Sequence, residues 1–488
     1  MLLEKILNNI ETIYTLGNLK IDINALCYDS RKANKDSVFF AIKGLADDGH
    51  KYISKAIEAG AKAIVFEDET FVESIPKTNL NVFIKVKDSR KALALASKNF
   101  YDDPTSKLNL IGITGTKGKT TTAFLIKSVL DLNGIKSGLI GTIANYIGDE
   151  KIKASLTTPE SLDALEMMDL MLKRNCKAAA MEVSSHSLEL DRVYGFNFFG
   201  GVFTNITSDH MDFHITFENY FKAKKKLFDC LGEKSFAIIN ADDPNSNKII
   251  ENCKAKILSY STINKNSVVY ISDIDYDLTE TRFVINYEAK SYKAKINLAG
   301  EFNAYNAAAA FLVGVALGLN PENVISSLAK AEQVPGRFET ITNGKKIAII
   351  DYAHTADSLE KTLMAIRKIS KGKNKIYTVF GCGGNRDKTK RPIMGDIATR
   401  LSDFVVITSD NPRFEEPEQI INDIVAGIKS GNYKKDPDRE SAIKWAIENS
   451  PDDAIILIAG KGHEDYQIVK DKRINFSDSE VAKKYFGI

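Results

Sequence analysis

One glycine-rich turn, between a strand-like run and a helix-like run, has the residue types and spacing for binding phosphate. The run LNLIGIT (108–114) leads into Gly115, Thr116, Lys117, Gly118, Lys119, Thr120 and Thr121, and then into a helical pattern. Glycines let backbone N–H groups close around phosphate oxygens, and a helix N-terminus favours an anion. We expect Lys119 to reach the outer phosphates of ATP or GTP and Thr120 to bind Mg²⁺. The alternative is an ordinary glycine-rich turn, since Ile113 replaces the first glycine of the strict pattern.

Glu182 and His210 are candidates for holding a magnesium ion in the same part of the chain. Each follows a strand-like run, and open α/β sheets bind ligands beyond the carboxyl ends of their strands. Mg²⁺ prefers oxygen ligands, so a carboxylate suits it and one imidazole is unusual but acceptable. Taken singly, a Glu at a strand end such as Glu182 is more often a capping residue, and a loop His such as His210 is more often a hydrogen-bonded structural residue. The histidines in polar segments after strands are His186, His210, His214, His354 and His463.

The strands and helices that must position these residues alternate along the chain, which indicates an α/β protein. Strands are predicted at 38–42, 61–66, 108–114, 346–351, 375–380, 404–409 and 454–459, and a helical stretch at 304–331. Breaks at 102–104 and 335–336 contain proline and turn residues. We therefore predict three domains, at residues 1–106, 107–334 and 335–488, the last with a doubly wound parallel sheet.

Composition argues against several classes of protein. The 488 residues include 66 Lys and Arg against 64 Asp and Glu, without the basic excess of nucleic-acid-binding or membrane-surface proteins. The five cysteines are scattered without C-x-x-C spacing, which fits a reducing compartment. No apolar run approaches the ~20 residues of a spanning helix, and the N-terminal segment lacks the pattern of a signal peptide. We expect a cytoplasmic protein that binds neither nucleic acid nor membrane.

The segment TGTKGKT (114–120) resembles the phosphate loop of the Mur ligase and folylpolyglutamate synthetase superfamily. EVSSHSL (182–188), TNITSDHMDFH (204–214) and YFKAKKKLF (220–228) follow in the order expected for Mur ligases, and the resemblance extends from Tyr28 to Gln467. It implies an N-terminal α/β uridine-nucleotide-binding domain, a central P-loop-type ATPase domain with a mostly parallel sheet, and a C-terminal Rossmann-like domain. It also implies that a substrate carboxylate takes the γ-phosphate of ATP and that an amine attacks the acyl phosphate.

For the ATP end of the reaction, the resemblance implies a magnesium site and a nucleotide site. Glu182 and His210 correspond to magnesium ligands, and Lys224 to a lysine that takes up CO₂ and binds metal as a carbamate. The alternative for Lys224 is a solvated helix face shared with the lysines at 222, 225 and 226. The remaining positions that correspond to the ATP site are the loop 115–121, Asn303, Asn306, Arg337, Asp351 and His354. Ala356 stands where the family usually has proline, which affects only a turn.

The same resemblance implies two further substrate sites. Positions that correspond to the UDP-muramoyl-dipeptide site are Ser30, Thr157, Thr158, Ser184 and Arg192. Positions that correspond to the amino-acid site are Arg386, Asp410, Asn411, Pro412, Arg413, Gly460 and Glu464. The DNPR segment (410–413) resembles that of members adding meso-diaminopimelate, whose distal amino-carboxylate suits a guanidinium beside two carboxylates. DNPR is also a type I turn pattern, and both interpretations can hold.

We therefore expect a monomeric Mg²⁺- and ATP-dependent ligase that joins meso-diaminopimelate, or an analogue such as meso-lanthionine, to UDP-N-acetylmuramoyl-L-Ala-D-Glu in peptidoglycan synthesis. A lysine-adding ligase is the main alternative, although Arg413 would then lack a carboxylate to bind. Folylpolyglutamate synthetase shares the ATP core but has no uridine-nucleotide domain, and DNPR argues against the MurF branch. A non-catalytic nucleotide-binding protein would not need Glu182, His210 and Lys224 together. The C-terminal domain is expected to close when substrates bind.

Overall fold

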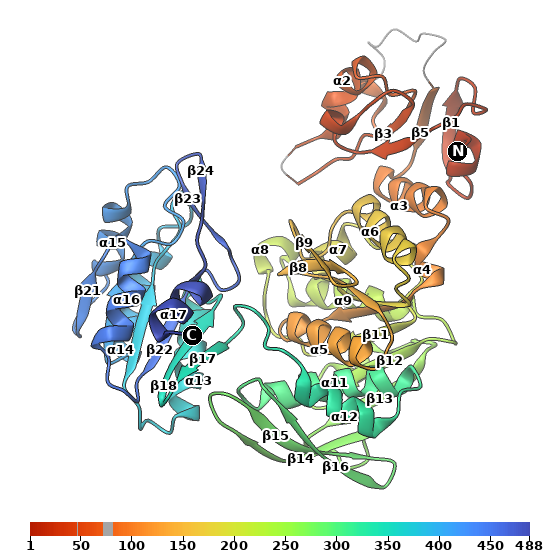
Figure 1. Ribbon diagram of the computed structural model, residues 1–488. Helices are drawn as coiled ribbons and strands as arrows, with labels where there is room; N and C mark the ends of the chain where they lie inside the picture. Colours follow the sequence, from red (N-terminus) through yellow and green to blue (C-terminus); the bar gives the residue numbers. More distant parts are fainter. Residues whose placement is uncertain (46, 72–81) are drawn as a thin grey trace. The chain divides into compact units, whose positions relative to one another are not determined.

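A five-stranded sheet forms the N-terminal part of the chain in the computed structural model, which describes residues 1–45, 47–71 and 82–488 (Figure 1). The strands are β1 (Thr12–Leu16), β2 (Ala25–Cys27), β3 (Ser37–Phe40), β4 (Ala63–Phe66) and β5 (Val82–Val86), in the order β1-β5-β4-β3-β2. The helices are α1 (Leu3–Ile6), α2 (Ile53–Glu58), α3 (Ser89–Phe100) and α4 (Pro104–Lys107), with 3₁₀ turns η1 (Ser30–Lys32), η2 (Gly49–Tyr52) and η3 (Glu69–Phe71). Every residue of β3 and β4 is buried, as expected for parallel strands covered on both faces.

The second sheet is built around β6, the strand that leads into the glycine-rich loop. Its strands are β6 (Asn109–Thr114), β7 (Ser137–Ile140), β8 (Ala144–Ile147), β9 (Glu150–Lys153), β10 (Ala178–Glu182), β11 (Gly200–Phe203), β12 (Phe236–Asn240), β13 (Lys256–Ser261), β14 (Val269–Tyr276), β15 (Thr281–Tyr287) and β16 (Lys290–Ile296). The order is β16-β15-β14-β13-β12-β11-β6-β10-β7-β8-β9. Since β10 and β11 both pair with β6 in parallel, the segments that follow these three strands emerge at one edge.

The helices of this region are α5 (Lys119–Leu132), α6 (Ser161–Lys173), α7 (Ser185–Glu189), α8 (Met211–His214), α9 (Phe217–Asp229), α10 (Ser246–Ile249), α11 (Phe302–Ala316) and α12 (Pro321–Lys330). The single helical stretch predicted over 304–331 is thus two helices. Gly318 has a φ of 83°, a left-handed conformation that ends helices, and Pro321 is the first residue of α12. The hairpin-linked strands β15 and β16 were not predicted from the sequence.

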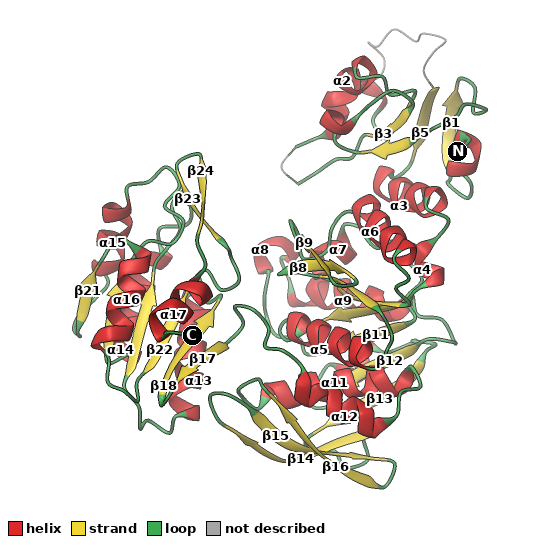
Figure 2. Cartoon of the chain, viewed as in Figure 1, coloured by secondary structure: helices red, strands yellow, loops and turns green. Residues whose placement is uncertain are grey.

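A six-stranded sheet, in the order β17-β18-β22-β19-β20-β21, forms the C-terminal part (Figure 2). Its strands are β17 (Glu339–Asn343), β18 (Lys346–Asp351), β19 (Ile376–Phe380), β20 (Phe404–Ile407), β21 (Tyr433–Lys435) and β22 (Ile455–Ala459), followed by the hairpin β23 (Tyr466–Val469) and β24 (Lys472–Asn475). The helices are α13 (Ala356–Ile369), α14 (Lys390–Leu401), α15 (Pro417–Val425), α16 (Arg439–Asn449) and α17 (Asp478–Phe486). Helices α13, α14 and α15 share one apolar core with the sheet, and α16 and α17 share the other.

The chain divides into two compact units, Met1–Tyr270 with Ala308–Val324, and Ile271–Ala307 with Ile325–Ile488. Parallel sheets covered by helices recur along the chain, which agrees with the predicted α/β class. The domain limits predicted near residues 106 and 334 stay predictions. In the part of the chain that the structure describes, no helix combines the length and apolar character needed to cross a bilayer.

Candidate active site

The loop between β6 and α5 is shaped by two glycines with positive φ. Gly115 has a φ of 151° and Gly118, the N-cap of α5, a φ of 86°. A Cβ atom on Gly115 would lie 2.0 Å from Thr204 Oγ1, so no other residue fits there. Lys117 N–H donates to the side chain of Asn205 across 3.0 Å, which ties the loop to the segment after β11. The loop therefore turns tightly into the N-terminus of α5, where Gly118 provides no side chain to cap the helix.

Two lysine side chains converge on the carbonyl oxygen of Gly115. Lys119 Nζ donates to this oxygen across 2.9 Å, and Lys224 Nζ donates to it from α9 across 2.8 Å. Lys224 Nζ also lies 4.6 Å from the ring centroid of Tyr220, and Lys224 is only 1% exposed. Burial, together with the charge of Lys119, holds the pKa of Lys224 well below its usual value. Lys224 therefore differs from a solvated surface lysine such as Lys222, whose side chain is 67% exposed.

Glu182, the last residue of β10, is fully buried and accepts hydrogen bonds at both carboxylate oxygens. Thr142 donates twice, from its N–H to Oε1 across 2.8 Å and from its hydroxyl to Oε2 across 3.1 Å. The hydroxyl of Thr120, in the first turn of α5, donates to Oε2 across 2.9 Å. A Cβ atom on Gly141 would lie 2.5 Å from Glu182 Oε1, so this approach requires glycine. Two of the predicted magnesium ligands, Thr120 and Glu182, are thus in direct contact.

His210 belongs to a cluster of rings that reaches the phosphate loop through Tyr220. Its ring centroid lies 4.8 Å from that of His186 and 6.3 Å from that of Tyr220. The hydroxyl of Tyr220 in turn shares a 2.9 Å hydrogen bond with Thr116 Oγ1. Among the described residues, no three His, Cys, Asp or Glu side chains form a metal-binding group. A magnesium site here therefore needs a ligand of another kind, such as the Thr120 hydroxyl.

Four of the five residues predicted for the UDP-muramoyl-dipeptide lie in one hydrogen-bonded group at the end of β10: Thr157, Thr158, Ser184 and Arg192. The Thr158 hydroxyl donates to the carbonyl oxygen of Glu182 across 2.8 Å and accepts from Ser184 N–H at 3.0 Å. Arg192 Nη1 donates to the carbonyl oxygen of Thr158 across 3.1 Å. The fifth residue, Ser30, lies in η1, separate from this group.

The residues predicted near ATP in the second unit make contacts within their own segments. The carboxylate of the half-buried Asp351 accepts from Phe338 N–H across 2.9 Å, and loss of solvent around it raises its pKa. The guanidinium of Arg337 lies 5.2 Å from the ring centroid of Tyr352. His354 Nδ1 lies 2.8 Å from the carbonyl oxygen of Tyr352. Asp351 thus fixes the turn that leads into β17, while Arg337 and His354 both pack on Tyr352.

Asn303 and Asn306 lie in the first two turns of α11 and are buried. Asn303 Nδ2 donates to the carbonyl oxygen of Ala299 across 2.8 Å, and Asn306 Nδ2 donates to Asn303 Oδ1 across 2.9 Å. Both side chains therefore help to form the helix start, and their place in the ATP site stays a prediction.

The loops after β20 and β22 carry six of the seven predicted amino-acid-binding residues, all except Arg386, and they contact each other directly. Asn411 Nδ2 donates to Glu464 Oε2 across 2.9 Å, and Gln467 Nε2 donates to the carbonyl oxygen of Asp410 across 2.7 Å. Gly460 has a φ of 116°, and a Cβ atom there would lie 2.9 Å from Asp410 Oδ2. Asp410 is buried, so its carboxylate is held against the Gly460 backbone at the carboxyl edge of the sheet.

The guanidinium of Arg413 lies among backbone carbonyl oxygens. Arg413 Nη1 donates to Gly384 O across 2.9 Å and to Asn411 O across 3.4 Å. Its own N–H donates to Ile468 O across 3.0 Å, which pairs the DNPR turn with β23. Within the described ranges no carboxylate forms an ion pair with Arg413, so the guanidinium keeps its charge available. Pro412 is buried in the same turn, and Arg386 is exposed on the loop after β19.

The sequence of this chain matches models of a known protein family along most of its length. The chain matches Mur ligase family, catalytic domain, at residues 22–101; Mur ligase middle domain, at 113–314; and Mur ligase, glutamate ligase domain, at 336–462. It is 46% identical, over 99% of both chains, to UDP-N-acetylmuramoyl-L-alanyl-D-glutamate--2,6-diaminopimelate ligase of Clostridium tetani. The chain belongs to the Mur ligase family. Ligase 1 of the same name from Clostridium acetobutylicum is also 46% identical over 99% of both chains.

A solved structure of UDP-N-acetylmuramoyl-L-alanyl-D-glutamate--2,6-diaminopimelate ligase matches this Mur ligase with a TM-score of 0.72 at 30% identity, over 100% of this chain and 99% of that chain. The family and the α/β class with three Mur ligase domains, both predicted from the sequence, are therefore confirmed.

Sequence reasoning missed several residues that shape the sites of this Mur ligase. Thr142 holds Glu182, and Tyr220 joins Lys224 to the phosphate loop. Thr142 follows the strand-like run SGLIG (137–141), so a polar residue after a strand was an available signal. Tyr220 gave no such signal, because it lies on a helix and acts through its position one turn before Lys224.

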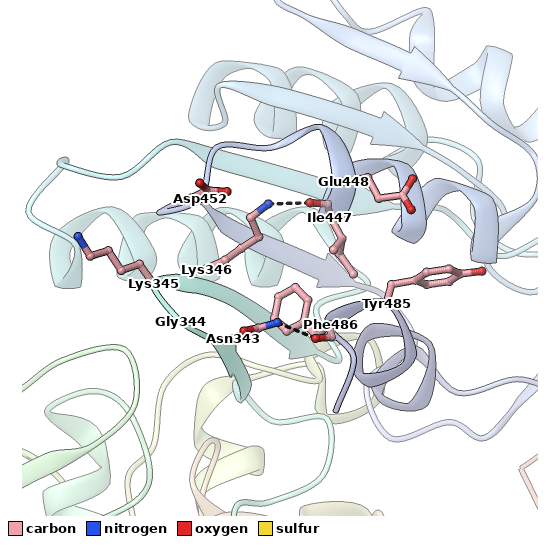
Figure 3. Close-up of a pocket in the computed structure, with 9 residues that line it drawn as sticks. All are labelled: Asn343, Gly344, Lys345, Lys346, Ile447, Glu448, Asp452, Tyr485 and Phe486. Carbon is pink, nitrogen blue, oxygen red and sulfur yellow. Dashed lines mark hydrogen bonds between the residues drawn. The ribbon is translucent and has the colours of Figure 1, made fainter.

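A depression of about 450 Å³ lies beside the β17–β18 turn and the C-terminal ends of α16 and α17 (Figure 3). Lys346 Nζ donates to the carbonyl oxygen of Ile447 across 2.7 Å, and Asn343 Nδ2 donates to that of Phe486 across 2.6 Å. These side chains satisfy carbonyl groups that helix ends leave without partners. The depression is thus accounted for by helix capping, and we assign no ligand to it.

Proposed function

We propose that this Mur ligase joins meso-diaminopimelate, or an analogue with the same two ends such as meso-lanthionine, to UDP-N-acetylmuramoyl-L-alanyl-D-glutamate, converting ATP to ADP and phosphate. The relatives that are 46% identical carry the name of a 2,6-diaminopimelate ligase. The observation that carries the proposal lies at the carboxyl edge of the C-terminal sheet, in residues 410–413 and 460–464, which we call the acceptor edge. There an Arg413 guanidinium without an ion-pair partner among the described residues lies on the same loop as the Asp410 carboxylate, beside Glu464.

The acceptor edge supports an amino acid with two charged ends. A guanidinium offers parallel donors that match a carboxylate, and Arg413 is held by carbonyl oxygens that leave its charge uncompensated. The buried carboxylate of Asp410 suits an ammonium group. Glu464, whose carboxylate accepts from Asn411 across 2.9 Å and from Lys461 Nζ across 3.1 Å, adds negative charge nearby. L-Lysine has an ammonium but no carboxylate at its distal end, so it would leave the Arg413 guanidinium unpaired.

The nucleotide end supports ATP and Mg²⁺. The backbone of the loop 115–118 and the N-terminus of α5 are suited to the phosphates of ATP, and Lys119 leaves the Gly115 carbonyl to meet them. Thr120, Glu182, His210 and a carbamylated Lys224 would hold magnesium, since the Thr120 and Glu182 oxygens are already 2.9 Å apart. Bound Mg²⁺ supplies positive charge that offsets the charge of the transferred phosphoryl group.

The residues of this chain then act by binding and orientation. Thr157, Thr158, Ser184 and Arg192 bind the dipeptide end of the nucleotide, and Ser30 binds its UDP-sugar. The D-Glu carboxylate takes the γ-phosphate, and Lys119 stabilises the charge that develops on its oxygens. The acceptor amine attacks the acyl phosphate, the C–N bond forms as the C–O bond to phosphate breaks, and the amine loses its proton. The further residues that we propose for nucleotide binding are Asn303, Asn306, Arg337, Asp351 and His354.

We also propose that the enzyme acts as a monomer in the cytoplasm. All five cysteines are free thiols, which agrees with a reducing compartment.

The proposed reaction is tested by phosphate release from ATP with Mg²⁺ and UDP-N-acetylmuramoyl-L-Ala-D-Glu, comparing meso-diaminopimelate, meso-lanthionine and L-lysine as acceptors. We expect stimulation by meso-diaminopimelate or meso-lanthionine and none by lysine. Stimulation by lysine alone would retain a ligase and overturn the role of Arg413. Phosphate release that does not depend on any of the three amino acids would overturn the proposed function.

A further inference from the structure

A fully buried ion pair contacts the start of both acceptor loops, residues 409–413 and 459–464. The reaction proposed above assigns no role to this pair. Arg439, the first residue of α16, and Asp478, the first residue of α17, both have side chains with no exposed surface. Arg439 Nε donates to Asp478 Oδ1 across 2.7 Å, and Arg439 Nη2 donates to Asp478 Oδ2 across 2.8 Å. The pair is therefore bidentate and fixes the guanidinium plane.

The rest of the guanidinium holds the two acceptor loops. Arg439 Nη1 donates to the carbonyl oxygen of Ser409 across 3.1 Å, and Nη2 donates to that of Ala459 across 3.0 Å. Ser409 directly precedes Asp410, and Ala459 directly precedes Gly460, the glycine whose backbone touches Asp410. One side chain thus sets the spacing between the strand ends from which both acceptor loops begin.

Arg439 also supplies charge to Asp410. Burial raises the pKa of Asp410, and the positive charges of Arg439 and Lys461 oppose that effect by favouring the carboxylate. A cation at the N-terminus of α16 is unfavourable for the helix itself, because the helix dipole places positive charge there. The position of Arg439 is therefore better explained by its hydrogen bonds to Ser409 and Ala459 than by the stability of α16.

We propose that Arg439, oriented by Asp478, is a positioning residue for the acceptor amino acid, setting the distance between the Asp410 and Gly460 loops. This inference rests on the proposed function, because it assigns the pair to the amino-acid step of that reaction. Arg439 does not touch the substrate; it acts through Asp410 and Gly460. The proposal predicts selective loss of acceptor binding, whereas a pair that only stabilises the fold would affect all substrates alike.

Two kinds of variant separate these roles. Arg439→Lys keeps the charge, but its single nitrogen cannot hold two carbonyl oxygens and a bidentate carboxylate together. The double variant Arg439→Met with Asp478→Leu removes both charges of the pair, so neither partner is left buried alone, and Lys461 still offsets the charge of Asp410. Arg367→Lys is the matched control. Arg367 joins Leu401 O and Asp403 in the same unit, next to the amino end of β20.

The measurements are KM for meso-diaminopimelate, for ATP and for the UDP-muramoyl-dipeptide, and amide hydrogen exchange at 409–413 and 459–464. We expect the acceptor KM to rise about tenfold or more in both Arg439 variants, with faster exchange in these two loops. The KM values for ATP and the nucleotide should change less than about twofold, as should all three in Arg367→Lys.

Unchanged loop exchange in the Arg439 variants, or an equal rise in all three KM values, would overturn the inference. Failure of the proposed function has a different signature, since the unaltered enzyme would then release no phosphate in response to meso-diaminopimelate. Hydrogen exchange would still decide in that case whether the pair positions the two loops.

Discussion

The hydroxyl of Thr120 donates a hydrogen bond to Glu182 Oε2 across 2.9 Å. It joins the first turn of α5 to the last residue of β10, which are brought together because β6 and β10 are parallel neighbours. Thr142 holds the other side of the carboxylate, so hydrogen bonds fix both oxygens of Glu182. The protein thus presents two oxygen ligands of the type that Mg²⁺ prefers at the end of the phosphate loop.

Glu182→Gln should weaken magnesium binding, because an amide carries no negative charge and one fewer accepting oxygen. We expect the Mg²⁺ concentration for half-maximal phosphate release to rise about tenfold or more, and the maximal rate to fall by on the order of 100-fold. Isothermal titration of Mg²⁺ with ADP gives a second readout. Glu189→Gln, which removes an exposed partner of Lys226, is the control and should change neither quantity. An unchanged Mg²⁺ dependence in Glu182→Gln would show that Glu182 is not a ligand.

Lys224 should carry a carbamate when CO₂ is present. Its lowered pKa means that the amine is neutral at a lower pH than an ordinary lysine, and only the neutral amine takes up CO₂. As pH falls through this lowered pKa, the amine becomes protonated, so carbamate and activity should be lost together. A ¹³C NMR signal from protein equilibrated with ¹³C-bicarbonate is the measurement.

Lys224→Arg should abolish that signal, since arginine stays protonated, and should lower activity by on the order of 100-fold. Lys222→Arg, on the exposed face of the same helix, is the matched control and should keep both signal and activity. A carbamate signal of equal size in Lys224→Arg would place the modification elsewhere.

Arg413→Met should weaken binding of the acceptor selectively. Loss of a charge-assisted contact to the distal carboxylate costs about 2 kcal/mol, which corresponds to a rise in acceptor KM of about 30-fold. Arg413→Lys should have an intermediate effect, because it keeps the charge without the planar fork. The KM for ATP should not change in either variant. Arg400→Lys, an exposed residue of α14 paired with Glu360, is the control. A similar rise in the KM for ATP would indicate general damage instead of a carboxylate contact.

Glu415 should make the protein less stable in acid. Hydrogen bonds from the buried Arg391 lower its pKa to about 2 from an ordinary value of 4.5. The folded state therefore favours the carboxylate. Its stabilising contribution is complete above pH 4.5 and is lost as pH falls toward 2.

The urea midpoint of the unaltered chain should consequently fall more steeply between pH 5 and 3 than that of Glu415→Gln. Glu418→Gln, at an exposed position of the neighbouring helix α15, should behave like the unaltered chain. Parallel pH dependence in Glu415→Gln and the unaltered chain would show that the Arg391 pair does not affect stability.

The sequence predicted those features that depend on local pattern. The strand predicted at 346–351 is β18, because a buried parallel strand reads as a continuous apolar run. The phosphate loop can be recognised from the sequence because its glycines, lysines and threonines all lie within one short run, 114–120. The helical stretch 304–331 was predicted as one element, because its apolar pattern continues across Gly318 and Pro321, whose backbone conformations divide it.

Contacts between distant positions could not be predicted in this way. Thr142 and Glu182 are 40 residues apart, and Arg439 and Asp478 are 39 apart. Each contact depends on sheet order and on the register of neighbouring elements, which no local pattern specifies. The family resemblance indicates which residues bind the substrates. The residues that hold those side chains in place are seen only in the folded chain.

The proposed reaction is tested at its product by the mass of the nucleotide after incubation with ATP, Mg²⁺, UDP-N-acetylmuramoyl-L-Ala-D-Glu and meso-diaminopimelate. We expect a UDP-linked product heavier by one meso-diaminopimelate less one water, formed in equal amount with ADP and phosphate. A nucleotide of unchanged mass, in a reaction that consumes ATP, would contradict it.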